Sequence, residues 1–344
     1  MRIESIFPNM VSQRLSDLSF GMVKNYFKNF VKLKLGKDMV DPYFSVLFLT
    51  FRCNYACAFC DEGSGKHKYP EIPMDELNTE DMKKILKILR KRSPSIYFTG
   101  GEPYLREDIV ELTRYAKELG FHPIYLNTNG SLIHTKPEVL DNIDNIVFSL
   151  HALDPEKYSK TIQRSTKMFD MVMENIEKAK SLMKEKNFDI GINCVVTPET
   201  LGDVEDVMEF CFERDLRFAI VPAIVKTKPQ EGLNSEKYRQ LINKVIAKKK
   251  EGRSVFNSYK YLEIIRSFED FDCHPMLTPH IHPDGSLLYP CNLMVKSKIN
   301  LLEIGDYDKA VEECRKKVGK LPACKSKCPL ACYVEPSVMT KNPF

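Results

Sequence analysis

The sequence predicts an α/β protein: a partial (β/α)6 barrel of the TIM type, followed by a small cysteine-rich C-terminal domain. Three observations lead to this fold class. Short apolar strands alternate with helical patterns between residues 45 and 221, which is typical of a parallel sheet. Polar motifs follow the strands, at the edge where such barrels place their active sites. Six of the eleven cysteines lie from residue 273 onward.

The composition narrows the class of protein. A chain of 344 residues with 43% hydrophobic residues can bury a large core, and a formal net charge of +4 gives no reason to expect a nucleic-acid partner. No apolar run approaches the length of a membrane-spanning helix. Clustered cysteines without a recognisable signal peptide favour metal binding in a reducing cytoplasm over a disulfide framework.

Residues 1–43 are predicted to form an N-terminal amphipathic helical extension. Between positions 10 and 35 apolar residues recur at helical spacing, with Val23, Phe27, Phe30 and Val31 on one face and a lysine stripe on another. Such a helix can lie on an anionic membrane surface, which would place the protein peripherally at the inner membrane face. Amphipathic helices more often dock on their own core, so we expect this one to pack on the barrel.

The predicted barrel covers residues 44–225. A lysine-rich helical connection is expected at 226–270 and the cysteine-rich domain at 271–344. The helical patterns of the barrel include 79–91, 106–119, 169–186 and 201–213. Its strands are expected at 45–50, 95–98, 123–127, 145–150, 189–196 and 217–221.

Three cysteines directly follow the first predicted strand. Cys53, Cys57 and Cys60 form a C-x3-C-x2-C run. Thiolates this close can face one point, which suits an iron–sulfur cluster held by cysteines. Three ligands on a four-iron cluster leave one iron without a protein ligand. This indicates a catalytic cluster rather than a purely structural one. A zinc site is the alternative, although zinc sites usually show paired Cys or Cys/His spacing.

This run resembles the signature of the radical S-adenosylmethionine (SAM) enzymes, C-x3-C-x-aromatic-C, with Phe59 as the aromatic residue. The resemblance implies an oxygen-sensitive cytoplasmic enzyme with a [4Fe-4S] cluster whose open iron is chelated by SAM. A one-electron donor such as ferredoxin or flavodoxin would reduce the cluster. SAM would then split into methionine and a 5′-deoxyadenosyl radical, which abstracts hydrogen from the substrate.

Further segments resemble the SAM-binding motifs of that family. The segment after the second strand matches a GGEP motif, which implies that it binds the methionine amino group of SAM. A TNG-like segment follows the third strand, Arg164 resembles a partner of the SAM carboxylate, and the sixth strand would lie along the adenine. The SAM contacts implied in this way are Gly100, Gly101, Glu102, Pro103, Asn129, Ser149, Arg164, Asn193 and Val221, with Phe59 from the cysteine run.

The C-terminal cysteines resemble the SPASM and smaller twitch extensions of radical SAM enzymes. One auxiliary [4Fe-4S] cluster fits better than two, because the full SPASM form has seven cysteines. The spacing C-x3-C-x3-C replaces the family's C-x2-C-x5-C, so the choice of four ligands stays open, and a zinc knob is the alternative. The five candidate ligands are Cys273, Cys291, Cys324, Cys328 and Cys332.

These patterns predict an enzyme that cleaves SAM reductively and abstracts hydrogen from an unactivated C–H bond. The basic N-terminal helix, running into the first strand, looks like radical SAM enzymes of lipid biosynthesis. We therefore expect a membrane isoprenoid lipid as substrate, with C–C bond formation. SPASM and twitch extensions are common in peptide-modifying enzymes, so a peptide maturase is the alternative. A non-catalytic zinc-binding regulator is the second alternative.

Overall fold

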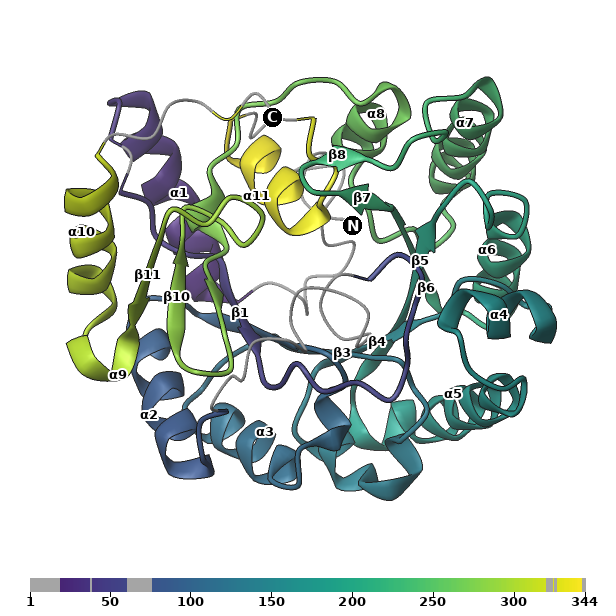
Figure 1. Cartoon of the computed structure of the whole chain (residues 1–344), viewed down its shortest axis with the longest axis horizontal. Helices are drawn as coiled ribbons and strands as arrows, with labels where there is room; N and C mark the ends of the chain where they lie inside the picture. The colour runs from purple at the N-terminus through teal and green to yellow at the C-terminus, as the bar shows by residue number, and fades with distance from the viewer. Residues whose placement is uncertain (1–18, 38, 61–75, 320–323, 325–326, 342–344) are drawn as a thin grey trace.

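The computed structural model describes residues 19–37, 39–60, 76–319, 324 and 327–341. One nine-stranded sheet runs in the order β11-β10-β9-β1-β2-β3-β4-β5-β6 (Figure 1). The six barrel strands pair in parallel in chain order and lie within one or two residues of the predicted positions, so the predicted fold class is confirmed. They are β1 (Phe44–Phe48), β2 (Ser95–Thr99), β3 (Ile124–Thr128), β4 (Asn145–Ser149), β5 (Asp189–Val196) and β6 (Arg217–Pro222).

Helices cover the outer face of this sheet (Figure 1). Each of them carries a buried apolar face, as in α2, where Met82, Ile85 and Leu89 are inaccessible to solvent. The helix predicted to begin at residue 106 begins at Ile109. A short 3-10 turn, η3 (Pro103–Leu105), precedes it. The helices are α2 (Thr79–Arg90), α3 (Ile109–Glu118), α4 (Pro155–Ile162), α5 (Lys167–Lys186), α6 (Val204–Glu213), α7 (Glu236–Lys250) and α8 (Tyr259–Ser267). The 3-10 turns η4 (Ile133–Thr135) and η5 (Pro137–Asp141) follow β3, and the hairpin β7 (Ile224–Val225) and β8 (Lys228–Pro229) follows β6.

The two faces of the barrel strands differ in burial. Along β5 the outward side chains, such as Ile192 and Cys194, are buried under helices, whereas inward Asn193 and Val195 are only half-buried. The same alternation holds in β4 and β6, because successive side chains of a strand point to opposite faces. The inner face of these three strands is therefore only partly covered, and the space enclosed by the barrel strands is called the channel below.

The C-terminal cysteine-rich region continues the barrel sheet. The strand β9 (His280–Ile281) pairs in parallel with β1, and β10 (Ser286–Tyr289) pairs antiparallel with both β9 and β11 (Ser297–Asn300). Helices α9 (Leu301–Ile304), α10 (Tyr307–Val318) and α11 (Ala331–Lys341) complete this region, together with η6 (Pro275–Leu277). The boundary expected at residue 271 therefore falls within one continuous sheet.

The N-terminal helix α1 (Phe20–Lys34) docks through a polar face. Asn25 donates to the carbonyl oxygen of Pro42 at 2.7 Å. Asn29 exchanges two 2.7 Å hydrogen bonds with the backbone of Asp41. The helix was expected to pack on the barrel by its apolar face, but Phe27 and Val31 are exposed. Residues 10–18 of the predicted helix lie outside the described residues.

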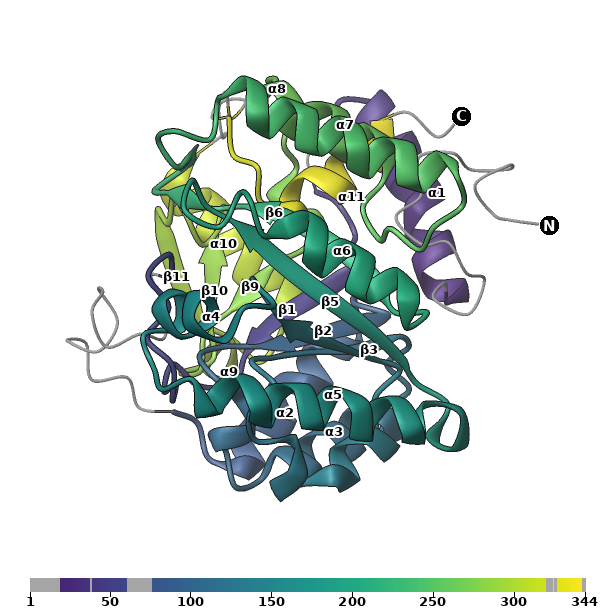
Figure 2. The ribbon, with the colours of Figure 1, turned by 90° about the vertical axis from the view of Figure 1, so that its right-hand side faces the viewer.

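The helices in the described part of the chain include none that is both long and apolar enough to cross a bilayer. The helix α1 lies at the edge of the molecule beside α11 (Figure 2). Its anchors, Pro42 and Arg92, stand just before β1 and β2. It therefore lies at the amino ends of these strands, opposite the ends that carry the polar motifs.

Candidate active site

The predicted cluster loop follows β1 at the carboxyl end of the sheet. Its backbone pairs with the end of α4, since Ala56 and Ala58 donate to the carbonyl oxygens of Ile162 and Thr161 at 3.0 Å. A 3.0 Å hydrogen bond from the Cys60 amide to the Cys57 carbonyl closes the C-x2-C turn. The sequence thus folds into a pinned loop that carries all three thiols, each only half-buried.

The three thiols share one electrostatic environment. Burial raises the pKa of Cys53 to about 11 and raises the pKa of Cys57 still further, and each thiol also disfavours ionisation of its neighbours. Adjacent thiolates need a cation to be stable in such a site. Among the described residues no three His, Cys, Asp or Glu side chains converge tightly enough for one metal ion, whereas a cluster spreads its ligands over several irons. The donor set fits an iron–sulfur cluster held by Cys53, Cys57 and Cys60.

The two glycines of the GGEP segment make room for the cluster loop. A Cβ on Gly100 would lie 2.2 Å from the carbonyl oxygen of Thr50, and one on Gly101 would lie 2.2 Å from that of Arg52. Gly100 also has a φ of +146°, which side chains rarely adopt. The two glycines therefore allow a close approach to the backbone just before Cys53. The amides of Gly101 and Glu102 donate to this backbone at 2.8 Å.

Glu102 is a fully buried carboxylate at the centre of the site. It accepts hydrogen bonds from the amides of Tyr104 and Asn129, at 3.1 and 2.7 Å, and from the hydroxyl of Thr128 at 2.8 Å. Burial raises its pKa to about 7 despite these donors, and no Lys or Arg of the described residues contributes to that balance. A buried carboxylate with only neutral donors suits an ammonium group as its ligand. Pro103, next in the chain, is buried at the start of η3.

Asn129 and Arg164 both hold the cluster loop through Asn54. The Asn129 side-chain amide donates to the Asn54 side-chain oxygen at 2.7 Å, and Asn54 donates in turn to Ser131 at 2.9 Å. The Arg164 guanidinium donates to the Asn54 carbonyl at 2.6 Å. Its positive charge also favours the thiolate form of Cys57. Two of the predicted SAM contacts are therefore tied directly to the loop.

The remaining predicted SAM contacts lie on the inner face of the sheet. Ser149 and Asn193 are register partners on β4 and β5, and Val221 on β6 is the partner of Val195. Phe59 packs edge-on against the ring of His151, with centroids 4.9 Å apart. The expected SAM contacts thus stand toward the carboxyl ends of the strands or on the loop that follows β1, except Arg164, which lies between α4 and α5.

His151 follows the strand β4 and contacts both the next strand and the cysteine run. It is buried, and its Nδ1 accepts the amide of Val195 at 3.1 Å. Burial lowers its pKa to about 4, so the ring is neutral. The Val195 amide belongs to a half-buried inner strand position, which no local sequence signal reveals. His151 therefore joins the strand β5 to the aromatic residue of the cysteine run.

Four of the five C-terminal candidate cysteines form one electrostatic group. Ionisation of Cys273 is disfavoured by Cys324, Cys328 and Cys291, and that of Cys328 by Cys291 and Cys324. The pKa values of Cys273, Cys291 and Cys328 are raised, and burial is the largest cause at each of them. Four thiols in one group, Cys291 and Cys328 buried and Cys273 and Cys324 half-buried, are the donor set of a fully ligated cluster.

The fifth candidate, Cys332, has different partners. Its sulfur lies 3.7 Å from Nε2 of His280, and its charge would affect Tyr97 on the inner face of β2. Neither Cys291 nor Cys328 has Cys332 among the groups that shift its pKa. Cys332 therefore stands between the auxiliary cysteines and the barrel channel.

Neutral aromatic and histidine rings connect the two cysteine fields. Phe48 lies between His280 and His282, at centroid distances of 5.9 and 5.7 Å, and Phe51 is 5.0 Å from His282. Burial lowers the pKa of both histidines to about 3, so they are uncharged near neutral pH. The hydroxyl of Tyr333 lies 2.9 Å from Nδ1 of His280. The sequence did not identify this group, because its members are brought together only by the pairing of β9 with β1.

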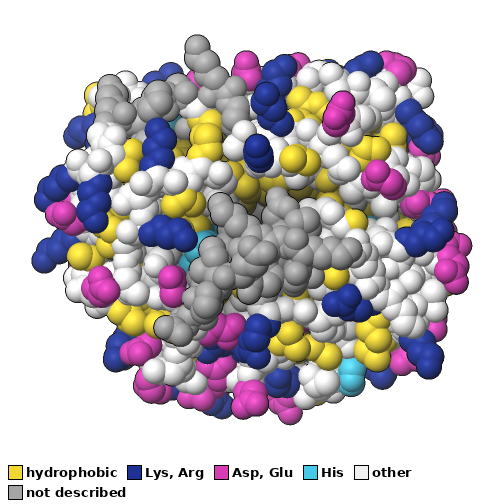
Figure 3. Space-filling view, in the orientation of Figure 1, with side chains coloured by type: hydrophobic (Ala, Val, Ile, Leu, Met, Phe, Trp, Pro, Cys, Tyr) yellow, Lys and Arg dark blue, Asp and Glu magenta, His cyan; other side chains and the backbone are white. Residues whose placement is uncertain are grey.

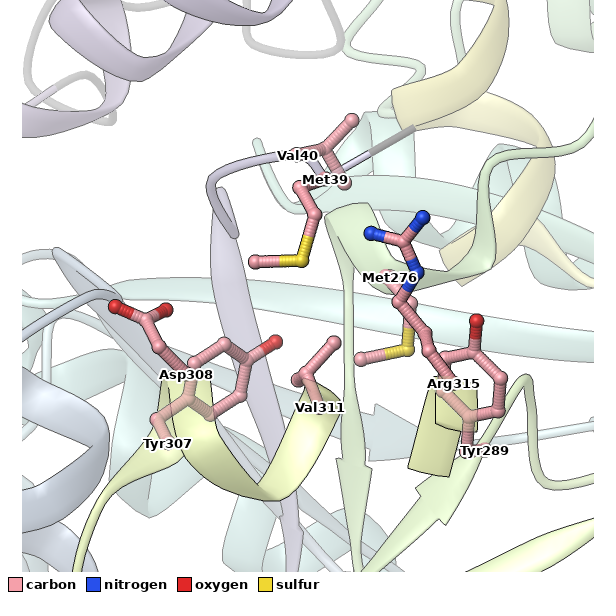
Figure 4. A pocket seen from close by; sticks show the side chains of 8 residues that line it. All are labelled: Met39, Val40, Met276, Tyr289, Tyr307, Asp308, Val311 and Arg315. Atoms are coloured by element: carbon pink, nitrogen blue, oxygen red, sulfur yellow. The ribbon is translucent and has the colours of Figure 1, made fainter. Parts of the chain in front are cut away.

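The face that carries the cluster loop shows hydrophobic side chains near its centre (Figure 3). A separate hollow of about 300 Å³ lies between the segment before β1 and α10 (Figure 4). Its lining includes Met39, Met276 and Tyr307 but none of the candidate cluster ligands. This hollow is therefore apart from the candidate active site.

Two family models match the chain in succession. The model of the radical SAM superfamily matches residues 47–211, and that of a domain of unknown function, DUF3463, matches residues 225–343. The probable GTP 3′,8-cyclase of Methanococcus aeolicus is 30% identical over 274 residues, which cover 74% of this chain and 86% of that protein. The GTP 3′,8-cyclase of Aquifex aeolicus is 35% identical over 153 residues, 43% of this chain and 46% of that protein. The chain thus spans less than half of the Aquifex relative.

Solved structures share the fold at low sequence identity. SuiB of Streptococcus suis is 22% identical with a TM-score of 0.61, covering 91% of this chain and 76% of that one. The structure of anSMEcpe with bound AdoMet is 21% identical with a TM-score of 0.56, covering 79% of this chain and 82% of that one.

Proposed function

Because the chain belongs to the radical SAM superfamily, we propose that it abstracts hydrogen from an unactivated C–H bond of a neutral isoprenoid lipid and forms a C–C bond. The bond joins two carbon radicals, each made by removal of one hydrogen atom at the expense of one SAM and one electron from the donor. The [4Fe-4S] cluster and SAM of this enzyme family supply the 5′-deoxyadenosyl radical that performs the abstraction. The protein contributes the thiol ligands, the SAM contacts and the channel that holds the substrate. The names of its relatives do not favour a lipid, so the argument rests on the channel.

The channel wall is the observation that carries this proposal. On the inner face of the six described barrel strands, the only charged side chains are Asp189 and Arg217, which form an ion pair at 2.5 Å near the amino ends of the strands. Closer to the cluster loop the wall presents neutral side chains, such as the stacked rings of Tyr97 and Tyr125. An uncharged, largely apolar substrate loses little hydration free energy in such a channel.

The residues of the site have distinct proposed roles. Glu102 pairs with the ammonium group of SAM, because it is the buried carboxylate with only neutral donors. Arg164 is close enough to the cluster loop to pair with the SAM carboxylate. Ser149 and Asn193, adjacent on the inner face, hydrogen-bond the polar groups of the ribose, and Val221 packs against the adenine. These roles position SAM so that its reactive carbon faces the channel.

GTP cyclisation is the second candidate, favoured by the name of the Methanococcus relative that the chain matches over 86% of its length. A nucleoside triphosphate carries several negative charges, which proteins usually neutralise with Arg, Lys or Mg²⁺. The inner strand face described above offers Arg217 alone, and Asp189 already pairs with it. Charge therefore favours the neutral lipid over GTP for this channel.

The test measures 5′-deoxyadenosine by mass spectrometry after anaerobic incubation of reconstituted protein with dithionite and SAM. A neutral polyisoprenoid, GTP and a peptide mixture are supplied separately. The polyisoprenoid is expected to raise deoxyadenosine formation above the background and to yield a product with a new C–C bond. Stimulation by GTP or by peptide alone would overturn the lipid assignment. The Cys57→Ala variant is the control and should form no deoxyadenosine.

Iron content tests the assignment of the ligands. We expect about eight irons per chain, four for each cluster, and a loss of about four in Cys53→Ala or in Cys324→Ser. Cys332→Ser is the comparison variant, because the Cys332 sulfur lies 3.7 Å from Nε2 of His280, and it should keep all its iron if the other four cysteines hold the auxiliary cluster. Loss of iron in this variant would make Cys332 a ligand. Tightly bound zinc in place of iron would instead support a zinc-binding protein.

A further inference from the structure

The apolar side of α1 faces solvent. Of the six strongly exposed large hydrophobic side chains among the described residues, four belong to this helix or its C-cap. At 3.6 residues per turn these four positions lie within an arc of about 80°. Phe20 is 84% exposed, Phe27 53%, Val31 54% and Leu35 66%. Contiguous exposed apolar surface of this kind marks an interaction site.

The opposite side of α1 is already fixed to the protein. Asn25 and Asn29 bind the backbone of the segment that enters β1. Lys32 pairs with Asp41 at 2.5 Å, and the Tyr26 hydroxyl donates to the carbonyl of Met339 in α11. The helix therefore does not need to turn or detach to present its apolar side. A docked helix with an outward apolar stripe is the reverse of the usual amphipathic arrangement.

The charge of the helix identifies what kind of surface it fits. The sequence of α1, from Phe20 to Lys34, contains no Asp or Glu. By the same geometry exposed Lys24 lies within this arc, and exposed Lys28 and Lys34 lie at its two edges. Lysine stems lie along apolar surface while their ammonium groups reach for polar or anionic groups. Apolar side chains flanked by lysines match the acyl boundary and the headgroups of an anionic bilayer.

We propose that the exposed face of α1 binds the surface of an anionic phospholipid bilayer, with the helix lying in the plane of the interface. Phe20, Phe27, Val31 and Leu35 enter the boundary between headgroups and acyl chains. The lysines beside them contact lipid phosphates. A protein partner or a second copy of this chain could instead cover this face of α1. The experiment below distinguishes these two possibilities from binding to a bilayer. The proposal does not depend on the identity of the substrate.

Co-sedimentation of the reconstituted full-length protein with vesicles tests the proposal. One vesicle preparation is phosphatidylcholine alone, and the other holds equal parts of phosphatidylcholine and phosphatidylglycerol. The protein is expected to bind the anionic vesicles and to bind less as added salt screens the lysines. Val31→Ser and Phe27→Ser are each expected to lower the partition coefficient about tenfold. Lys28→Glu should lower it about fivefold or more.

Two matched variants serve as controls. Val225→Ser changes a valine of similar exposure, 56%, on the hairpin strand β7. Lys184→Glu changes an exposed lysine in the last turn of α5. Neither should alter vesicle binding, and every variant should keep its iron and its deoxyadenosine formation, because the changed side chains lie away from the cysteines. These readouts separate a failure of this proposal from a failure of the proposed function.

Three results would overturn the proposal. The first is absence of binding to the anionic vesicles. The second is an equal loss of binding in the Val225→Ser control. The third is a dimer in light scattering that Val31→Ser dissociates, because a second copy would then cover the helix.

Discussion

Glu102 illustrates how burial tunes a single residue of the site. Its raised pKa of about 7 means that the carboxyl is partly protonated at neutral pH before SAM arrives. An ammonium ligand requires the ionised form, and protonation of the carboxyl as the pH falls competes with binding. SAM affinity should therefore fall about tenfold for each unit of pH below about 7. Calorimetric titration of the anaerobic protein at about pH 8 and about pH 6 measures this effect.

Glu102→Gln is the control for that titration. The variant should bind SAM weakly and with little dependence on pH, while its iron content stays at the wild-type level. A pH dependence that survives in the variant would assign the titration to another group. An equal loss of iron and of SAM binding would make Glu102 a residue that holds the loop rather than SAM.

At the scale of single residues, the sequence predicts the cluster ligands better than it predicts the tertiary contacts of individual side chains. The spacing of Cys53, Cys57 and Cys60 carries its own chemistry, so these residues could be identified without a fold. The contact between Cys332 and His280 could not, because it depends on where α11 places that side chain. The same holds for His151, whose partner is a backbone amide of β5.

Among the elements, the turn after β2 is the most tightly constrained by the cluster loop. Gly101→Ala would bring a methyl group within 2.2 Å of the Arg52 carbonyl oxygen, which only a backbone shift can relieve. We expect it to destabilise the protein by about 3 kcal/mol and to lower iron incorporation, because the shift reaches Cys53. Chemical denaturation and iron analysis measure the two effects.

Gly202→Ala is the matched control for the glycine substitution. A Cβ at Gly202 would meet only the far end of Lys237, 3.9 Å away. Both stability and iron content should stay close to the wild-type values. A Gly101→Ala variant that behaves like this control would show that the loop can move aside at little cost.

At the scale of elements, the periodicity of apolar residues locates helices and strands. It does not determine which face of a helix packs against the rest of the protein. The barrel strands were predictable because apolar runs alternate with helices. The orientation of α1 was not, because its contacts are made by Asn25 and Asn29, two residues that a hydrophobic pattern assigns to the solvent side. Hydrogen bonds to the backbone before β1 decide the orientation, and no helical pattern encodes them.

On the scale of the whole molecule, the cysteine-rich region and the barrel share one sheet. The strand β1 is hydrogen-bonded to β2 on one side and to β9 on the other. We therefore expect β1 and the 280–289 segment to lose protection from hydrogen exchange at the same urea concentration. Exchange followed by mass spectrometry of peptides compares the two. Earlier loss of protection in the 280–289 segment would show that the C-terminal region unfolds as a separate domain.

The proposed binding of α1 to a bilayer, together with the proposed lipid substrate, would have a kinetic consequence. A catalyst held at an interface encounters its substrate by diffusion in two dimensions. Its rate then follows the mole fraction of that substrate in the surface rather than the amount in the tube. Adding inert carrier lipid at constant total substrate should therefore slow turnover, because it lowers the mole fraction of substrate in the surface.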